Sequence, residues 1–347
     1  MKKNNCIAII GCSIPSLYAG IKCLTMGYSV TIYEKQSQSV HSDTLSRQNL
    51  KIFNENHISY IELLKSYQIQ YEKISDIKYN SDLFNFMSIV MQRSKAIPNN
   101  ILVSQTMTGL CANLMINIDF IKHDNTFDYI FDKISAFECI NIFKNDFIED
   151  INYYHLNRRD IDNLLKKMCS RFESNGGKIV YNSQVTNVRY VKRKFNLMIN
   201  NSIYYSDILL TTISKMNLSL FGFWNSEQRM LLNATQGVPT SNISTMMDKI
   251  IKLPDNISIL DEFTDVNHML LNDLHIVYPI IANKHKMTYI WNININNVLV
   301  SEKIKHMYNE RFLICSESFS KNNMFVNYSL EYVNNTLNTL YHNIKQI

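Results

Sequence analysis

Residues 4–34 read NNCIAIIGCSIPSLYAGIKCLTMGYSVTIYE, and this stretch decides the fold. Its apolar run over residues 4–10 predicts a short buried strand. Apolar side chains then recur at helical spacing over residues 14–26, until Gly27, a residue type that favours the position just after a helix. Residues 28–33 predict a second strand. Strand, turn, helix and strand follow in the order of a right-handed parallel crossover, which predicts an α/β fold.

The turn after the first strand has the position of a dinucleotide-binding fingerprint. That fingerprint, G-x-G-x-x-G, allows a tight turn and close approach of a diphosphate to the helix N-terminus. The equivalent residues here are Gly11, Ser13 and Ser16, so only the first glycine is kept. Glu34 follows the second strand, where a carboxylate can accept a hydrogen bond from a ribose hydroxyl. The unit therefore predicts nucleotide binding; the alternative is a strand–helix–strand unit without a nucleotide, in which Glu34 is a surface acid.

Composition limits the classes of protein that the chain can belong to. With 347 residues, 46% hydrophobic and 19% charged, it predicts a soluble globular protein of two interleaved domains. The net charge of +5 is spread along the chain, and its densest basic cluster, residues 192–194, lies between two strand-like runs. We interpret this cluster as a solvated hairpin tip, and we expect no nucleic-acid partner.

Cysteine usage and hydropathy point to a location in the cytoplasm. The seven cysteines are scattered without a CxxC pair, which favours a reducing compartment and gives no support for a zinc site. The apolar run near the N-terminus is too short for a signal peptide. No segment reaches the roughly 18 apolar residues of a membrane span, so we expect no membrane partner.

Glycine is scarce in this chain. Only eight glycines occur, against roughly 24 at the average usage of about 7%. Abundant Asn, Ile, Lys and Tyr suggest AT-rich coding, which can remove dispensable glycines. A glycine that needs a positive φ resists replacement, so the glycines that remain are informative.

The rest of the chain alternates strand-like and helical patterns. Residues 160–173 form a clear amphipathic helix that ends at Gly176 and Gly177. Strand-like runs follow at residues 178–181, 185–190, 195–199, 202–205 and 207–212, and a further strand and a helix lie near residues 311–315 and 329–345. We predict a discontinuous Rossmann-like domain of residues 1–80, 151–225 and 296–347. Residues 81–150 and 226–295 are predicted to form a mixed α+β substrate domain.

Four segments, in this order, resemble the flavin-dependent amine oxidases, the family that includes monoamine oxidase and the amine-oxidase-like proteins of large DNA viruses. The first is the N-terminal unit. The second covers residues 153–213 and includes Gly176, Gly177 and YYSDILLTTISKMNL. The third covers residues 260–298, with HIVYPIIANKHKMTYIW, and the fourth is FLICSESFSKNNMFVNYSLEYVNNTL at residues 312–337. The resemblance is strongest in appearance to the viral members, which implies the host cytoplasm or the virion as the location.

The resemblance implies an FAD-binding fold and a set of cofactor-binding residues. These are Gly11, Ser13, Ser16, Glu34, Val185, Ser316 and Glu317. In the family, the strand around Val185 sets a backbone amide and carbonyl against the adenine, and a Gly-acid pair, here Ser316 and Glu317, contacts the cofactor. Tyr328 stands where the family has a glycine beside the flavin ring. The family's arginine and double glycine after the ribose acid are absent from residues 36–44.

Two functions follow from the resemblance and its departures. The first is an FAD-dependent oxidoreductase that oxidises an amine-like small molecule by hydride transfer to the flavin. The alternative is a catalytically degenerate relative with a binding or structural role, in which FAD is weakly held or lost. An NAD(P)-dependent dehydrogenase would leave the matches around Val185 and Glu317 unexplained. No catalytic residue can be assigned: Lys284 and Lys286 are only near the position of the family's lysine. Tyr289 and Trp291 are candidates for its aromatic pair, but aromatic residues at this strand spacing more often serve core or surface packing.

Overall fold

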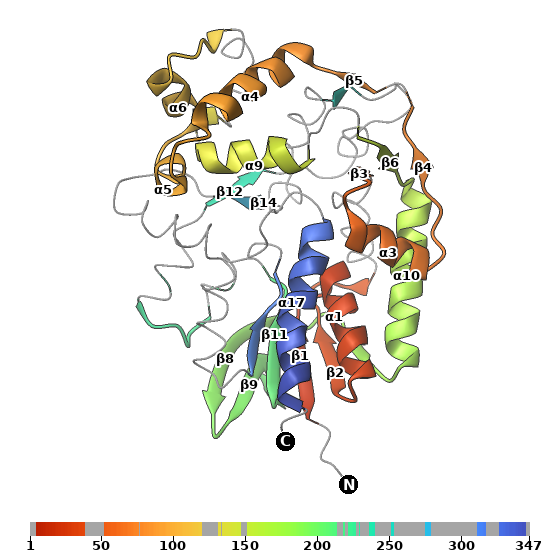
Figure 1. The fold of residues 1–347 in the computed structure, drawn as a ribbon. Helices are drawn as coiled ribbons and strands as arrows, with labels where there is room; N and C mark the ends of the chain where they lie inside the picture. The colour runs from red at the N-terminus through yellow and green to blue at the C-terminus, as the bar shows by residue number, and fades with distance from the viewer. Residues whose placement is uncertain are drawn as a thin grey trace. The chain divides into compact units, whose positions relative to one another are not determined.

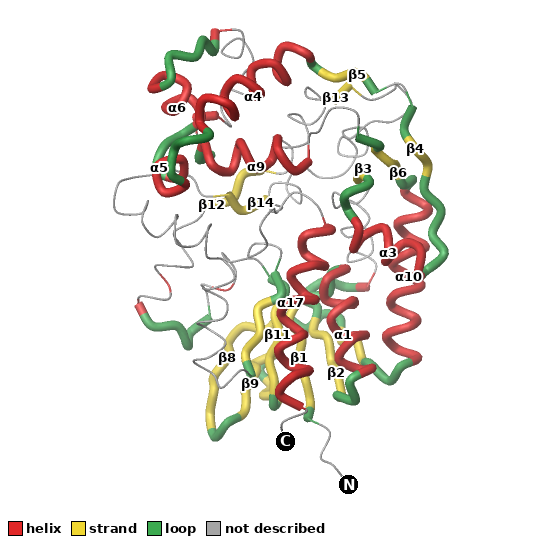
Figure 2. The backbone as a smooth tube through the Cα atoms, in the orientation of Figure 1, coloured by secondary structure: helices red, strands yellow, loops and turns green. Residues whose placement is uncertain are grey.

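The structure is a computed structural model (Figures 1 and 2). By its internal contacts, the chain divides into two compact units. Unit 1 consists of residues 1–72, 155–232 and 297–347, and unit 2 of residues 73–154 and 233–296. The described residues are 5–38, 52–75, 77–119, 131–132, 134–146, 151–213, 218, 221–226, 229, 236–239, 251–252, 275–278, 311–316 and 326–344. The roles assigned above to the two predicted domains stay predictions.

A five-stranded parallel sheet forms the centre of unit 1 (Figure 1). Its order is β15-β11-β1-β2-β7, with the bounds Phe312–Ile314, Ile208–Thr211, Cys6–Ile10, Ser29–Tyr33 and Lys178–Val180. In the register, Ile7 is the partner of Val30 on one side and of Ile208 on the other. This sheet and the helices beside it confirm the predicted α/β class.

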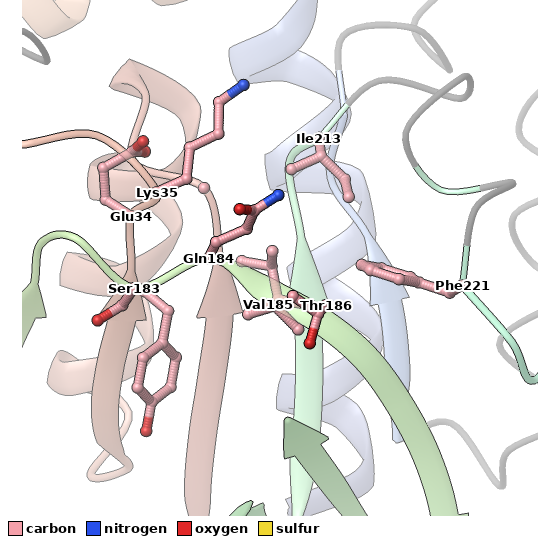
Figure 3. Close-up of a pocket in the computed structure, with 11 residues that line it drawn as sticks. Glu34, Lys35, Ser183, Gln184, Val185, Thr186, Ile213 and Phe221 are labelled. Carbon is pink, nitrogen blue, oxygen red and sulfur yellow. The ribbon is translucent and has the colours of Figure 1, made fainter. Parts of the chain in front are cut away.

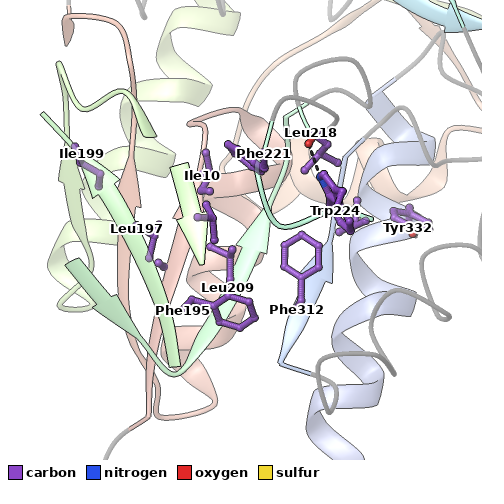
Figure 4. Close-up of a cluster of buried hydrophobic side chains, with 13 residues drawn as sticks. Ile10, Phe195, Leu197, Ile199, Leu209, Leu218, Phe221, Trp224, Phe312 and Tyr332 are labelled. Carbon is purple, nitrogen blue, oxygen red and sulfur yellow. Dashed lines mark hydrogen bonds between the residues drawn. The ribbon is translucent and has the colours of Figure 1, made fainter. Parts of the chain in front are cut away.

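Both faces of β1 are covered, which explains its continuous apolar sequence. Ile9 faces helix α1, because a β-carbon added to Gly20 of that helix would lie 3.5 Å from the Ile9 side chain. Ala8 and Ile10 belong instead to a core cluster on the other face. That cluster contains Val188, Phe195, Leu197, Ile199, Leu209, Leu218, Phe221, Trp224, Phe312, Ile314 and Tyr332 as well (Figure 4).

Three helices of unit 1 pack around the first crossover, with α1 (Ile14–Thr25) in contact with both α10 (Arg158–Ser174) and α17 (Val326–Ile344). Helix α3 (Ile58–Ser66) packs on α17, and the short strand β3 (Ile52–Asn54) precedes it. Helix α1 ends before Gly27 and α10 before Gly176, both at positive φ, as the sequence predicted.

A second sheet in unit 1 is a three-stranded antiparallel meander. It consists of β8 (Val185–Val191), β9 (Lys194–Ile199) and β10 (Ser202–Ser206), in the order β10-β9-β8. Lys192 and Arg193 connect β8 to β9 with φ of 51° and 64°, the backbone signature of a tight hairpin turn. The basic cluster is thus at a hairpin tip, as predicted.

Unit 2 contains the helices α4 (Ser81–Ser94), α5 (Asn99–Val103), α6 (Met107–Asn113) and α9 (Ala136–Asp146) among its described residues. Helix α9 contacts the other three. Short antiparallel pairs join β5 (Lys78–Tyr79) to β13 (Ile251–Lys252), and β12 (Gln236–Pro239) to β14 (His275–Tyr278). The strands β4 (Glu72–Lys73) and β6 (Tyr153–His155) lie where the chain passes between the units. Within the described part of the chain, no helix is long and apolar enough to span a membrane.

Candidate functional site

A pocket of about 320 Å³ lies at the carboxyl ends of β1 and β2, the edge where open α/β sheets bind ligands (Figure 3). Its lining comes from four segments of unit 1: Ile10 and Gly11 at the end of β1; Tyr33, Glu34 and Lys35 at the end of β2; residues 183–186 at the start of β8; and Ile213 and Phe221 after β11. Figure 3 shows Glu34 and Lys35 on one side of the pocket, Phe221 on the other, and Val185 and Thr186 between them.

Gly11 closes the end of β1 in a conformation that favours glycine. Its φ is +88°, and its N–H donates to the Tyr33 carbonyl over 2.9 Å. A β-carbon at this position would lie 3.2 Å from both Thr212 Oγ1 and Ile213 Cγ2. Conformation and space therefore both explain why this glycine has been kept in a glycine-poor chain.

The carboxylate of Glu34 is held by two backbone amides. Its Oε2 accepts from the Cys12 N–H over 2.8 Å, and its Oε1 accepts from the Gln36 N–H over 2.9 Å. The residue is only 6% exposed. Each carboxylate oxygen keeps a further acceptor site, so Glu34 presents an oriented anion that can receive the hydroxyl groups of a ligand.

The wall of the pocket opposite Glu34 is apolar, and part of it comes from an irregular start of β8. Val185 pairs with Ile199 of β9, and the register then shifts before Asn187, which leaves Thr186 outside regular pairing. Such bulges re-aim side chains next to binding sites. Together with Ile213 and Phe221, Val185 gives the pocket a surface suited to a flat, apolar group.

Burial keeps the pocket's thiol and phenol neighbours uncharged. It raises the pKa of Tyr33, with further contributions from Tyr204 and Cys6. Burial likewise raises the pKa of the Cys12 thiol well above its ordinary value, and Cys169 and Glu34 add to the effect. Cys12 is therefore protonated at neutral pH and is not an activated nucleophile. Within the described lining, Glu34 is the acidic side chain and Lys35 the basic one.

The N-terminus of α1 is closed by its own side chains. Ser13 is the N-cap; its Oγ accepts from the Ser16 N–H over 3.3 Å, while the Ser16 Oγ accepts from the Ser13 N–H over 3.0 Å. The two hydroxyl oxygens are 2.9 Å apart, and the Ser16 Oγ lies 2.6 Å from Thr212 Oγ1. This reciprocal arrangement is a capping box, here made by two serines and extended to Thr212.

Few backbone donors of this turn remain for a ligand. The Cys12 N–H is directed to Glu34, those of Ser13 and Ser16 take part in the capping box, and Pro15 has none. Within residues 12–16, the Ile14 N–H is left without a hydrogen bond to any described residue.

FAD, the cofactor implied by the fold, therefore matches this site only in part. Gly11, Glu34 and Val185 line one pocket and suit the adenosine half. The diphosphate half does not fit, because Ser13 and Ser16 place β-carbons and mutually bonded hydroxyls where the fingerprint has glycines. Of the predicted cofactor residues, the structure brings Gly11, Glu34 and Val185 into the pocket, and it places Ser13 and Ser16 at the adjoining end of α1.

The residues expected near a flavin are described only in part. Ser316 is fully buried after β15, and Tyr328 lies in the first turn of α17 with its ring centroid 5.7 Å from that of His57. Glu317 and the four candidates Lys284, Lys286, Tyr289 and Trp291 lie outside the described residues. Across the described part of the chain, no group of three or more His, Cys, Asp or Glu is arranged to hold a metal ion.

The residues of this site that the sequence reasoning missed include Pro15, Lys35, Thr212 and Phe221. Pro15 and Lys35 stand beside predicted residues and so carried a local signal, whereas Thr212 directly follows β11 and reaches the site only through the pairing of β11 with β1. Phe221 lies in a segment without clear periodicity and offered none.

Comparison with solved structures gives the class of this fold: it is that of amine oxidases. The chain is similar to cyclohexylamine oxidase from Brevibacterium oxydans IH-35A, with 8% identity, a TM-score of 0.63, and coverage of 97% of this chain and 100% of that one. It is also similar to wild-type putrescine oxidase bound to putrescine, with 9% identity, a TM-score of 0.62, and coverage of 97% and 99%. No family model matches the sequence, and no curated protein is similar to it.

Proposed function

We propose that this chain is a binding protein built on the amine-oxidase fold, and that it takes the adenosine part of a nucleotide into the pocket of Gly11, Glu34 and Val185. The observation that carries the proposal is the Glu34 carboxylate, which two backbone amides fix at the edge of an otherwise apolar cavity. A ribose diol can donate to this carboxylate, and a flat base can pack against Val185 and Phe221. Gly11 lets the ligand approach the backbone.

A second function, FAD-dependent oxidation of an amine-like small molecule, is favoured by a different observation. The described architecture matches two amine oxidases over almost their whole length, and Glu34 and Val185 share one pocket. On this proposal the chain is an FAD-binding oxidoreductase of the amine-oxidase type. A cytoplasmic or virion location and a viral source stay predictions from the sequence under either function.

An absorbance and binding experiment separates the two functions. We expect purified protein to be colourless, to stay without flavin after FAD is added, and to bind adenosine in calorimetry. Glu34→Gln should weaken adenosine binding by about tenfold or more, because the charged acceptor is lost. Glu173→Gln, an exposed carboxylate on α10, is the matched control and should bind as the wild type does.

The opposite results are equally clear. A yellow protein that bleaches anaerobically with an amine would establish the oxidase and contradict the binding role. Adenosine binding that is unchanged in Glu34→Gln would show that the ligand does not use this carboxylate.

A further inference from the structure

We infer that the pocket selects a nucleoside, such as adenosine, that carries no diphosphate, and that the hydrogen bonds joining Ser13, Ser16 and Thr212 set this selectivity. The inference deepens the proposed binding function and rests on it. It follows from the mismatch between the two halves of the site: the pocket beside Glu34 is open, whereas the turn that should hold phosphates is closed.

Existing hydrogen bonds occupy the amides that a diphosphate would use. A diphosphate at this turn needs free amides, but those of Ser13 and Ser16 are used within the capping box. To free them, both serine side chains must rotate, which also breaks the 2.6 Å contact between Ser16 and Thr212. Ser16 is fully buried, so its hydroxyl would lose these partners away from water.

The charge of Glu34 also disfavours a diphosphate at this turn. The Cys12 N–H donates to the buried Glu34 carboxylate, so this amide already serves an anion that belongs to the protein. A diphosphate placed beside the same turn would add negative charge near that carboxylate. Lys35 is the cationic side chain in the described lining, whereas a diphosphate carries more than one negative charge. A neutral nucleoside avoids this repulsion.

A nucleoside needs only groups that the pocket supplies. Its sugar hydroxyls require an acceptor, which Glu34 supplies, and its base requires an apolar surface, which Val185, Ile213 and Phe221 supply. All of these residues lie in the pocket itself. None of them requires the capping box to open.

The test measures the binding of adenosine, ADP and FAD to the full chain by calorimetry at one salt concentration. Three proteins are compared: the wild type, the double variant S13G/S16G, and N80G. The double variant restores the glycines of the fingerprint. N80G removes the side-chain cap of α4 in unit 2, and it therefore controls for the loss of a cap away from the pocket.

For the wild type, we expect adenosine to bind more tightly than ADP and FAD by about tenfold or more. In S13G/S16G, the affinity for ADP should rise by about tenfold, while the affinity for adenosine should change by less than about threefold. N80G should keep the wild-type order. Circular dichroism on all three proteins confirms that they are folded.

Two results would overturn the inference while leaving nucleotide binding intact: wild-type protein that prefers ADP or FAD to adenosine, or a folded S13G/S16G protein with an unchanged ratio of ADP to adenosine affinity. Absence of binding by all three compounds to the wild type would overturn the proposed binding function together with the inference. The ratio of ADP to adenosine affinity thus distinguishes failure of the selectivity inference from failure of the proposed binding function.

Discussion

Gly11 and Gly27 have nearly equal φ, +88° and +87°, but different surroundings. A β-carbon at Gly11 would meet Thr212 and Ile213 at 3.2 Å, whereas nothing lies within 4 Å of one at Gly27. We expect Gly27→Ala to lower the free energy of unfolding by about 1 kcal/mol, from backbone strain alone. Gly11→Ala should lower it by about 2–3 kcal/mol, because crowding adds to the strain. Urea unfolding measures both, and equal losses would contradict the role assigned to Thr212 and Ile213.

The Asp207 carboxyl should make the stability of the protein depend on pH. Burial by itself would raise the pKa of this carboxyl, but two hydrogen bonds from Cys6 and the ammonium of Lys194 at 3.4 Å outweigh it, so the pKa lies below its ordinary value. A carboxyl with a lowered folded-state pKa stabilises the protein above its unfolded-state pKa of about 3.9, and this contribution disappears as the pH falls through the folded-state value.

Asp207→Asn should therefore reduce the free energy of unfolding at pH 6 to 7 and leave it unchanged at the acid end of the transition. We expect a difference below about 1 kcal/mol, because the Lys194 side chain is half exposed. Unfolding by urea at a series of pH values measures it. Parallel curves for the two proteins over the whole range would show that the Asp207 carboxyl has an ordinary pKa.

At the scale of elements, one ring explains two of the retained glycines. β-carbons at Gly20 in α1 and at Gly177 after α10 would lie 2.7 Å and 2.5 Å from atoms of the Phe172 ring. Phe172 is fully buried, so its ring cannot move into solvent. The α1–α10 contact is therefore built on the absence of side chains opposite this ring. Helix propensity alone would favour Ala over Gly at position 20 by about 1 kcal/mol.

We expect crowding to exceed this propensity gain, so that Gly20→Ala lowers the free energy of unfolding by about 1–2 kcal/mol. Shortening the ring with Phe172→Leu should reverse the sign of the Gly20→Ala effect, because the β-carbon then has room. A double-mutant cycle measures the coupling between the two positions. Additive effects of the two substitutions would show that the helices adjust without contact between these residues.

The elements themselves could be predicted largely from local patterns. The first strand, α1 and the second strand differ from prediction by at most a residue or two at their ends, because apolar periodicity and Gly27 are local signals. The pairing of β7 with β2, and of β15 with β11, joins segments that are far apart in sequence. No local pattern encodes such pairs, and they were not predicted from the sequence.

The residues of the candidate site could likewise be predicted where a local pattern marks them, and not where distant segments meet. Gly11 and Glu34 follow from the strand–helix–strand unit, whereas Val185 was placed by resemblance. The closed state of the α1 N-terminus was missed because the spacing of Ser13 and Ser16 was compared with glycines and not with capping residues. Its third member, Thr212, directly follows β11, a strand that only the folded sheet brings near α1.

At the scale of the whole molecule, unit 1 is assembled from three separate segments, and its cohesion can be measured through cysteines. Cys23 on α1 and Cys315 after β15 lie in different segments of unit 1, and both are fully buried. Cys111 and Cys139 are buried in unit 2. Burial raises the pKa of Cys23 to about 12 and that of Cys111 to about 11, so the native thiols are protonated and react slowly at neutral pH.

Alkylation in increasing urea, read by mass spectrometry, should therefore report the opening of each unit. We expect Cys23 and Cys315 to become labelled at one urea concentration, because the central sheet and α1 lose their contacts together when a parallel sheet opens. Cys111 and Cys139 should share a midpoint of their own. Cys169, which is half-buried, serves as the reference for labelling that precedes unfolding. Separate midpoints for Cys23 and Cys315 would mean that the β15 segment opens independently, and that the three segments of unit 1 do not form one cooperative structure.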